Sequence, residues 1–163
     1  MEYKLKLLQL IFVSAIVSSF AVQADDDFVL VDSDDIRMNN AFKKAKATLS
    51  SFLKIVDKGR DKNFVYSAYV QIKDNGETEY LWVTDILKYD KEYYIGYVVS
   101  KPRLVSSVKE GETIGYKVDE IFDWQRYDKN KNITYGGYTT CVLLDMKSKE
   151  DMDYAKEIGL QCK

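Results

Sequence analysis

Residues 64–87 read FVYSAYVQIK (64–73), DNG (74–76) and ETEYLWVTDIL (77–87). In the first segment, apolar side chains occupy alternate positions, as in a strand with one face on a core. Asn75-Gly76 between two such segments is a strong signal for a two-residue hairpin turn. The stretch therefore predicts two antiparallel strands, 64–73 and 78–87. The residues expected on the core face of the first strand are Phe64, Tyr66, Ala68, Val70 and Ile72.

The segments on both sides of this hairpin extend the prediction. From Ile36 to a point before Gly59, apolar residues recur at three- and four-residue steps, which predicts one long helix. A short helix is expected from Ser148, because Ser148 and Asp151 have the spacing of a capping box. Turn residues separate the other β-forming blocks. These further strands are expected at 93–100, 104–108, 113–118, 121–127 and 135–144.

This order of elements predicts an α+β fold. We expect a curved antiparallel β-sheet, partly closed and barrel-like, packed by one long N-terminal helix, with a short C-terminal helix. The predicted strands contain many tyrosines, and this suggests an alternative to a closed sheet. In that alternative the sheet stays open, and a tyrosine-rich face forms a contact surface for a protein or a glycan.

Residues 1–24 have the pattern of an export signal. Two lysines near the start precede an apolar run, and small residues occupy the last and third-last positions before Asp25. We expect cleavage between Ala24 and Asp25 and a periplasmic or secreted protein. An uncleaved membrane anchor is the alternative, although polar residues dilute the run.

The remaining chain divides into two parts. Residues 25–35 contain six aspartates and no basic residue, so they are expected to form an acidic leader. Residues 36–163 are expected to form a single domain with its own core.

Composition limits the possible chemistry. The chain has 163 residues, 24 Lys and Arg against 26 Asp and Glu, and no His. The small net charge does not suggest nucleic-acid binding. Histidine, the commonest general base and metal ligand, is absent, and the usual glycine-rich phosphate-binding motifs are absent as well. We therefore expect no cofactor, no metal site and no identifiable catalytic residue.

Cys141 and Cys162 are expected to pair in an oxidising compartment. If 138–145 is a strand and 149–160 a helix that turns back, the two sulfur atoms end near one level. A reactive redox pair is the weaker alternative, because the spacing is not C-x-x-C.

The predicted N-terminal helix and the turn after it carry many lysines and arginines and few acids. Lys43, Lys44 and Lys46 are part of this group. One interpretation is an ordinary solvated helix surface near the acidic leader. The other is a docking face for an acidic partner.

Several motifs resemble the YegJ-like family of bacterial proteins, domain of unknown function 2314. They include Met38-Asn39-x-Ala41, the strand motif Glu79-x-x-Trp82, and Asp123-Trp124 followed by Gly136-x-Tyr138-Thr139. The resemblance covers about residues 35–144 and implies a small sheet-and-helix module, often exported, with some relatives that look like immunity proteins of toxin systems.

The motif residues Glu79, Trp82, Asp123, Trp124 and Tyr138 are candidates for a binding groove. Their alternative role is structural, with the aspartate accepting turn amides and the tryptophans filling the core.

Together these features predict an exported, non-enzymatic module that binds another protein, in the manner of an immunity protein. Two alternatives stay open. One is an envelope enzyme that uses carboxylates such as Glu79 and Asp123. The other is a protein that binds a glycan or a small ligand.

Overall fold

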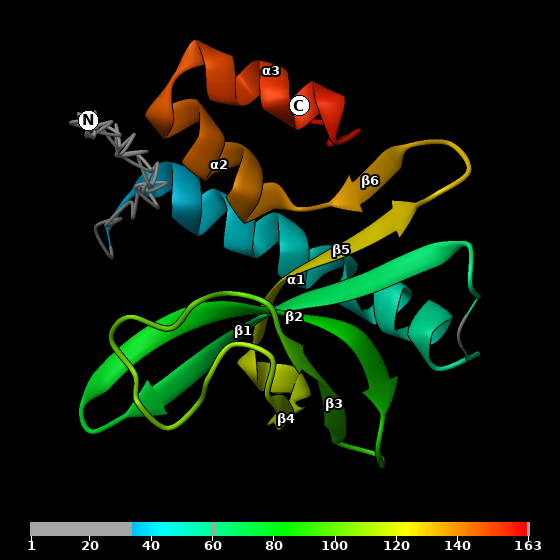
Figure 1. Cartoon of the computed structure of the whole chain (residues 1–163), viewed down its shortest axis with the longest axis vertical. Helices are drawn as coiled ribbons and strands as arrows, with labels where there is room; N and C mark the ends of the chain where they lie inside the picture. Colours follow the sequence, from blue (N-terminus) through cyan, green and yellow to red (C-terminus); the bar gives the residue numbers. More distant parts are fainter. Residues whose placement is uncertain (1–33, 60, 163) are drawn as a thin grey trace, which may run out of the picture.

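The computed structural model of the chain describes residues 34–59 and 61–162. The predicted signal peptide, its cleavage site at Ala24–Asp25 and almost all of the acidic leader lie outside the described residues. No helix among the described residues is long and apolar enough to cross a membrane. The described residues form an α+β fold with one antiparallel sheet and three α-helices (Figure 1).

The hairpin at the centre of the sheet confirms the two antiparallel strands that were predicted for residues 64–87. Strand β1 (Phe64–Asp74) pairs with β2 (Glu77–Lys88), with Val70 opposite Leu81. Asn75 and Gly76 have φ angles of 50° and 89°. Both therefore occupy the left-handed region that a two-residue hairpin turn of this kind needs.

The sheet has six strands in the order β4-β3-β2-β1-β5-β6, and each neighbouring pair is antiparallel. Beside the hairpin, the strands are β3 (Tyr93–Val98), β4 (Thr113–Lys117), β5 (Ile121–Asp128) and β6 (Ile133–Gly136), with a short 3-10 helix, η1 (Val118–Glu120), before β5.

The expectation of a partly closed barrel is wrong, because β4 and β6 lie at opposite ends of an open sheet. At Asp85, which has a φ of 53°, the register between β2 and β3 shifts, and β3 pairs only with the Val83–Lys88 half of β2. The block 104–108 is also not a strand. It belongs to the loop 99–112, which we call the long loop.

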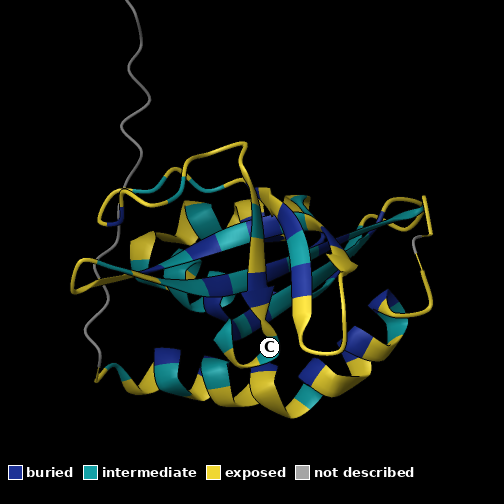
Figure 2. Cartoon of the chain, turned by 90° about the horizontal axis from the view of Figure 1, so that it is seen from below, coloured by how far each residue is buried: buried dark blue, intermediate teal, exposed yellow. Residues whose placement is uncertain are grey.

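Helix α1 (Ile36–Val56) begins at Asp35, whose carboxylate accepts hydrogen bonds from the backbone N of Arg37 and Met38 at 2.8 and 3.2 Å. The buried face of α1 lies toward the sheet, and its exposed face points away from it (Figure 2). Burial of the large side chains of this core, at about 25 cal/mol per Å² of apolar surface, is the main source of stability. The central residues of the core are Leu49, Phe52, Leu53, Tyr66, Ala68, Val70, Leu81, Val83 and Ile121.

The C-terminal part differs from the sequence prediction. Residues expected to continue a strand to 144 form helix α2 (Tyr138–Lys147), because β6 ends at Gly136. Gly136 has a φ of 80°, and a Cβ there would lie 2.1 Å from the Trp124 carbonyl oxygen, so only glycine permits the sharp turn.

Helix α3 (Lys149–Glu157) begins after Ser148, as predicted, with the Ser148 hydroxyl accepting a hydrogen bond from Asp151 N at 3.1 Å. Cys141 and Cys162 form the expected disulfide, with their Cα atoms 5.4 Å apart. The bond joins α2 to the segment after α3, instead of a strand to a helix. Leu160 bridges to Thr134 of β6, so the C-terminal segment covers that edge of the sheet.

Candidate functional site

Glu79 lies on β2 and is almost fully buried, with 7% of its surface exposed. Its carboxylate accepts hydrogen bonds from the backbone N of Arg103, Leu104 and Val105 at 2.9–3.1 Å. Three amides of one loop therefore converge on one side chain. Glu79 holds the long loop against the part of β2 that β3 leaves unpaired.

Asp74, at the end of β1, supports the same loop. Its carboxylate accepts hydrogen bonds from Ser106 N, Ser106 Oγ and Ser107 N at 2.8–2.9 Å. These hydrogen bonds, led by those from Ser106, hold the pKa of the Asp74 carboxyl below its usual value. The sequence gives no signal for this role of Asp74, because Asp-Asn-Gly is explained fully by the turn that it forms.

Asp123 is completely buried on β5. One carboxylate oxygen accepts hydrogen bonds from the backbone N and the hydroxyl of Thr139, both at 2.7 Å, and the other accepts from Trp124 N at 2.7 Å. Burial raises the pKa of Asp123 to about 6, while the hydrogen bonds from Thr139 and Trp124 act in the opposite direction. The carboxylate thus satisfies the Thr139 amide at the start of α2, where Gly137 supplies no capping side chain.

Trp124 and Tyr138 pack between elements. The Trp124 ring stacks on Phe52 of α1 at a centroid distance of 4.7 Å, and Tyr138 meets its edge at 6.1 Å. The indole N–H donates to Thr48 Oγ1 at 3.1 Å and to Ala45 O at 3.3 Å. These contacts support the structural interpretation of both residues.

Trp82 belongs to a different group of rings, which we call the aromatic row: Phe42, Tyr69, Tyr80, Trp82 and Phe122. Trp82 lies 5.0 Å from Tyr69, which lies 5.6 Å from Tyr80. Tyr80 in turn contacts Phe42 of α1 at 5.5 Å and Phe122 of β5 at 4.9 Å. All five side chains are half-buried, so the row combines packing with partial exposure.

Lys46 connects the aromatic row to α1. Its Nζ lies 4.7 Å from the centre of the Phe122 ring and donates to the Asp119 carbonyl at 3.0 Å. Burial lowers the pKa of Lys46, and the charge of Asp119 opposes this effect. Lys46 is therefore fixed in place, unlike the other lysines of the helix.

The exposed side of α1 and the turn after it carry further lysines. Lys43, Lys44, Lys54 and Lys58 are exposed, and none has an ion pair or a side-chain hydrogen bond with another described residue. We call these four residues the basic face. Two small residues, Ala47 and Ser50, lie between the lysines along the helix. The surface is thus a row of cations with room for an approaching partner.

The structure separates the predicted site residues into two sets. Glu79, Asp123, Trp124 and Tyr138 hold loops and helices in place, and the acceptors of both carboxylates are occupied by protein donors. Lys43 and Lys44 belong to the basic face, which Lys46 links to Trp82 through the aromatic row. Phe42 and Phe122 were not expected here, since a helical apolar stripe and an alternating strand predict only core positions for them.

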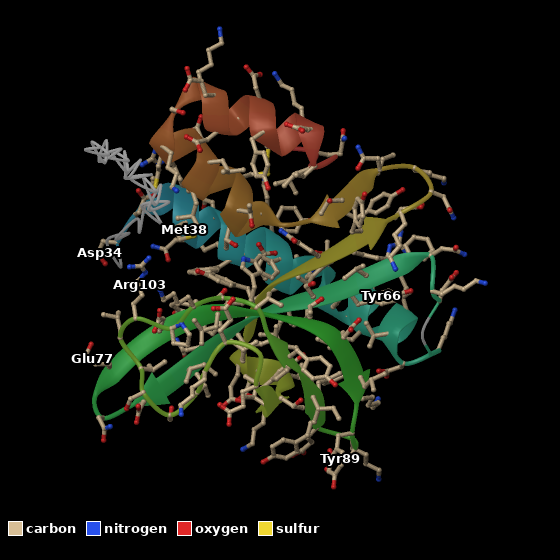
Figure 3. All side chains as sticks on the ribbon, viewed as in Figure 1. Asp34, Met38, Tyr66, Glu77, Tyr89 and Arg103 are labelled. Carbon is tan, nitrogen blue, oxygen red and sulfur yellow. A yellow bond between two sulfur atoms is a disulfide. The ribbon has the colours of Figure 1, made fainter. Side chains whose placement is uncertain are left out.

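A second group of rings, which is more exposed than the aromatic row, lies around the turn between β2 and β3. Tyr89 in the β2–β3 turn is 72% exposed (Figure 3). With Asp90, Tyr93, Ile95 and Gly115 it lines an open hollow of about 290 Å³. No described group of three or more Cys, Asp or Glu side chains has the geometry of a metal site.

Comparison with known proteins places the chain among bacterial proteins. It is 26% identical over 138 residues to a protein of Neisseria meningitidis serogroup B that is named as an ankyrin repeat protein. That match covers 80% of this chain and 53% of the relative, so the chain spans about half the length of the relative. No solved structure matches. The family model described as "uncharacterized protein conserved in bacteria (DUF2314)" matches residues 35–162, and the chain therefore belongs to this family.

Proposed function

We propose that the protein is an exported, non-enzymatic module of the YegJ-like type, whose basic face binds an acidic surface on another protein. The observation that carries this proposal is the absence of partners for Lys43, Lys44, Lys54 and Lys58 among the described residues. Lys43 and Lys44 are adjacent, and Lys54 and Lys58 lie four residues apart at the end of α1, so the like charges within each pair repel. An acidic partner would relieve this repulsion.

The surroundings of the basic face favour a protein partner. Lys46 lies against Phe122 and leads from the helix to the half-buried aromatic row. Aromatic residues are enriched in protein interfaces, where they supply contact area with little loss of conformational freedom. Rim charges such as the lysines mainly accelerate association and make it sensitive to salt.

The proposed export rests on the tripartite pattern of residues 1–24, and the Cys141–Cys162 disulfide is consistent with an oxidising compartment. An immunity-like role, in which the module covers an acidic surface of a toxin, would be one form of this function.

The test compares proteins captured by three tagged forms of residues 25–163, produced in an oxidising compartment. The forms are the wild type, a triple variant Lys43→Glu, Lys44→Glu, Lys54→Glu, and a control Lys91→Glu, Lys101→Glu, Lys109→Glu. The control changes the net charge by the same amount at exposed positions away from α1.

Capture from envelope and secreted fractions is carried out at about 50 mM and about 300 mM NaCl. The proposal predicts a stoichiometric partner that the wild type and the control retain at low salt, and that the α1 variant loses. A partner that binds the α1 variant as well as the wild type would exclude the basic face as the contact. Turnover of a substrate by the purified protein would support the carboxylate enzyme instead.

A further inference from the structure

Arg126 occupies an unusual position in the sheet. It lies on β5, directly opposite Tyr66 of β1 and Tyr135 of β6. The guanidinium carbon is 4.6 Å from the centre of the Tyr135 ring and 5.0 Å from that of Phe64. Rings from both neighbouring strands thus flank the guanidinium group. Figure 3 labels Tyr66 at the end of the sheet where β1 begins and β5 ends.

The Arg126 guanidinium acts on the nearby Tyr66 hydroxyl through its charge, since burial raises the pKa of Tyr66 and Arg126 opposes this effect. No hydrogen-bond partner for the guanidinium is found among the described residues. Its Nε atom is buried and makes no hydrogen bond, and the side chain forms no ion pair. Asp128, two residues along the same strand, does not fill this role. Its carboxylate accepts hydrogen bonds from the backbone N of Asn130 and Lys131 at 3.0 and 3.2 Å, and Lys131 Nζ lies 4.0 Å away.

Buried donors without partners are rare in native proteins, and each calls for an explanation such as a bound water or ion. A guanidinium group has five N–H donors in a planar fork, and its faces can stack on aromatic rings. Contacts with rings occupy the faces and leave the edge of the fork for hydrogen bonding.

The fork matches the spacing of two oxygen atoms on a carboxylate or a phosphate, which bind it through parallel hydrogen bonds. We infer that Arg126, flanked by Phe64 and Tyr135, is the centre of an oxyanion-binding site that takes a carboxylate or a phosphate group. This site is separate from the basic face of α1, so its test does not depend on the proposed function.

The experiment is an NMR titration of the Arg126 side-chain Nε–H signal in the ¹⁵N-labelled protein. The probes are inorganic phosphate and, separately, acetylglutamate, with ionic strength held constant by sodium chloride. We expect a saturable shift of this signal with at least one probe. We also expect that probe to raise the melting temperature above its value in chloride of equal ionic strength.

The Arg126→Lys variant keeps the positive charge and loses the fork. We expect it to weaken binding at least about tenfold, as judged by backbone amide shifts of β5 and β6. The control Lys131→Gln removes a neighbouring charge and keeps the fork, so its affinity is expected to stay within about threefold of the wild type. The α1 charge-reversal variant should bind the probe normally.

Saturation by phosphate alone would identify phosphate or a phosphoester as the ligand class, and saturation by acetylglutamate alone would identify a carboxylate. Two results would overturn the inference. One is a shift that does not saturate with either probe. The other is equal binding by Arg126→Lys and the wild type, since that would mean a general response to charge.

Discussion

Asp123 and Thr139 are 16 residues apart in the sequence and form a doubly hydrogen-bonded pair, with one carboxylate oxygen 2.7 Å from both the backbone N and the hydroxyl of Thr139. Neither residue is exposed. The pair joins β5 to the first turn of α2, and the disulfide joins α2 to the end of the chain. The C-terminal helices therefore depend on a carboxylate in the sheet.

Replacing Thr139 by Val removes the hydroxyl while keeping the shape of the side chain. At pH 8 we expect this change to lower the free energy of unfolding by about 1 to 3 kcal/mol, because a hydrogen bond to an ionised and buried group is lost. Urea unfolding measures the change. Thr78→Val, at an exposed position of β2, is the control and is expected to change stability by less than about 0.5 kcal/mol. If Thr139→Val and Thr78→Val lower the free energy of unfolding by the same amount, the Thr139 side chain contributes only packing.

The pH dependence of stability follows from Asp123. Burial raises its folded-state pKa to about 6 from an ordinary value of 3.8. The folded protein then binds this proton more tightly than the unfolded chain does, so the stabilisation is full below about pH 4 and is lost as the pH rises through about 6.

We therefore expect the stability of the wild type, relative to Asp123→Asn, to fall by about 2 to 3 kcal/mol between pH 4 and pH 7. Chemical unfolding of both proteins at several pH values measures this difference. The shared effects of other carboxyls, such as Asp74, cancel in the comparison. A difference that stays constant over this range would mean that Asp123 titrates as an ordinary carboxyl.

Local patterns were sufficient for the parts of the fold that depend on neighbouring residues. The hairpin follows from alternation and from Asn75-Gly76, and the start of α3 follows from Ser148. Helix α2 was missed because Thr139, Thr140 and Val142 favour strands, whereas the distant Asp123 accepts hydrogen bonds from the Thr139 amide and hydroxyl at the helix start. The open sheet was only the alternative to a partly closed one, because a register shift at Asp85 depends on pairing between strands and leaves no local pattern.

The candidate site shows the same limit. A lysine-rich helix predicted the basic face, but only the structure shows that Lys46 is held against Phe122 while Lys43 and Lys44 stay free. The acids of the motifs were recognised, yet the loop and helix amides that they hold lie 16 to 26 residues away in sequence. Arg126 gave no signal, because its importance comes from rings on two other strands.

Glu79→Gln should loosen the long loop. Oε2 of Glu79 accepts from all three backbone N–H groups, and Oε1 accepts a second hydrogen bond from Arg103 N. The neutral amide weakens these charge-assisted hydrogen bonds and replaces one acceptor oxygen by an NH2 donor, at a cost of about 1 to 3 kcal/mol. We expect faster hydrogen exchange at the amides of Leu104 and Val105, with little change in α2. The exposed Glu77→Gln is the matched control. Unchanged exchange at the two amides would show that the loop is held by other contacts.

Removing the disulfide with Cys141→Ser and Cys162→Ser should lower the free energy of unfolding by about 3 kcal/mol, as expected for a closed loop of about 20 residues. The loss should be local, with faster hydrogen exchange in α2 and α3 and little change in the β1–β2 hairpin. Reduction of the wild type is expected to reproduce the effect, and the serine variant should not respond to the reductant. Uniform acceleration across the sheet would contradict this local role.

The basic face is tested most directly by site-specific photo-crosslinking in cells that express the full chain. A photoreactive phenylalanine analogue replaces Ala47, which lies among the lysines on the exposed side of α1, or Glu77 at the tip of the β1–β2 hairpin. The account predicts a discrete adduct from position 47 that is absent from position 77, and that disappears when Lys43 and Lys44 are changed to Glu. No adduct at position 47, or the same adduct from both positions, would contradict it.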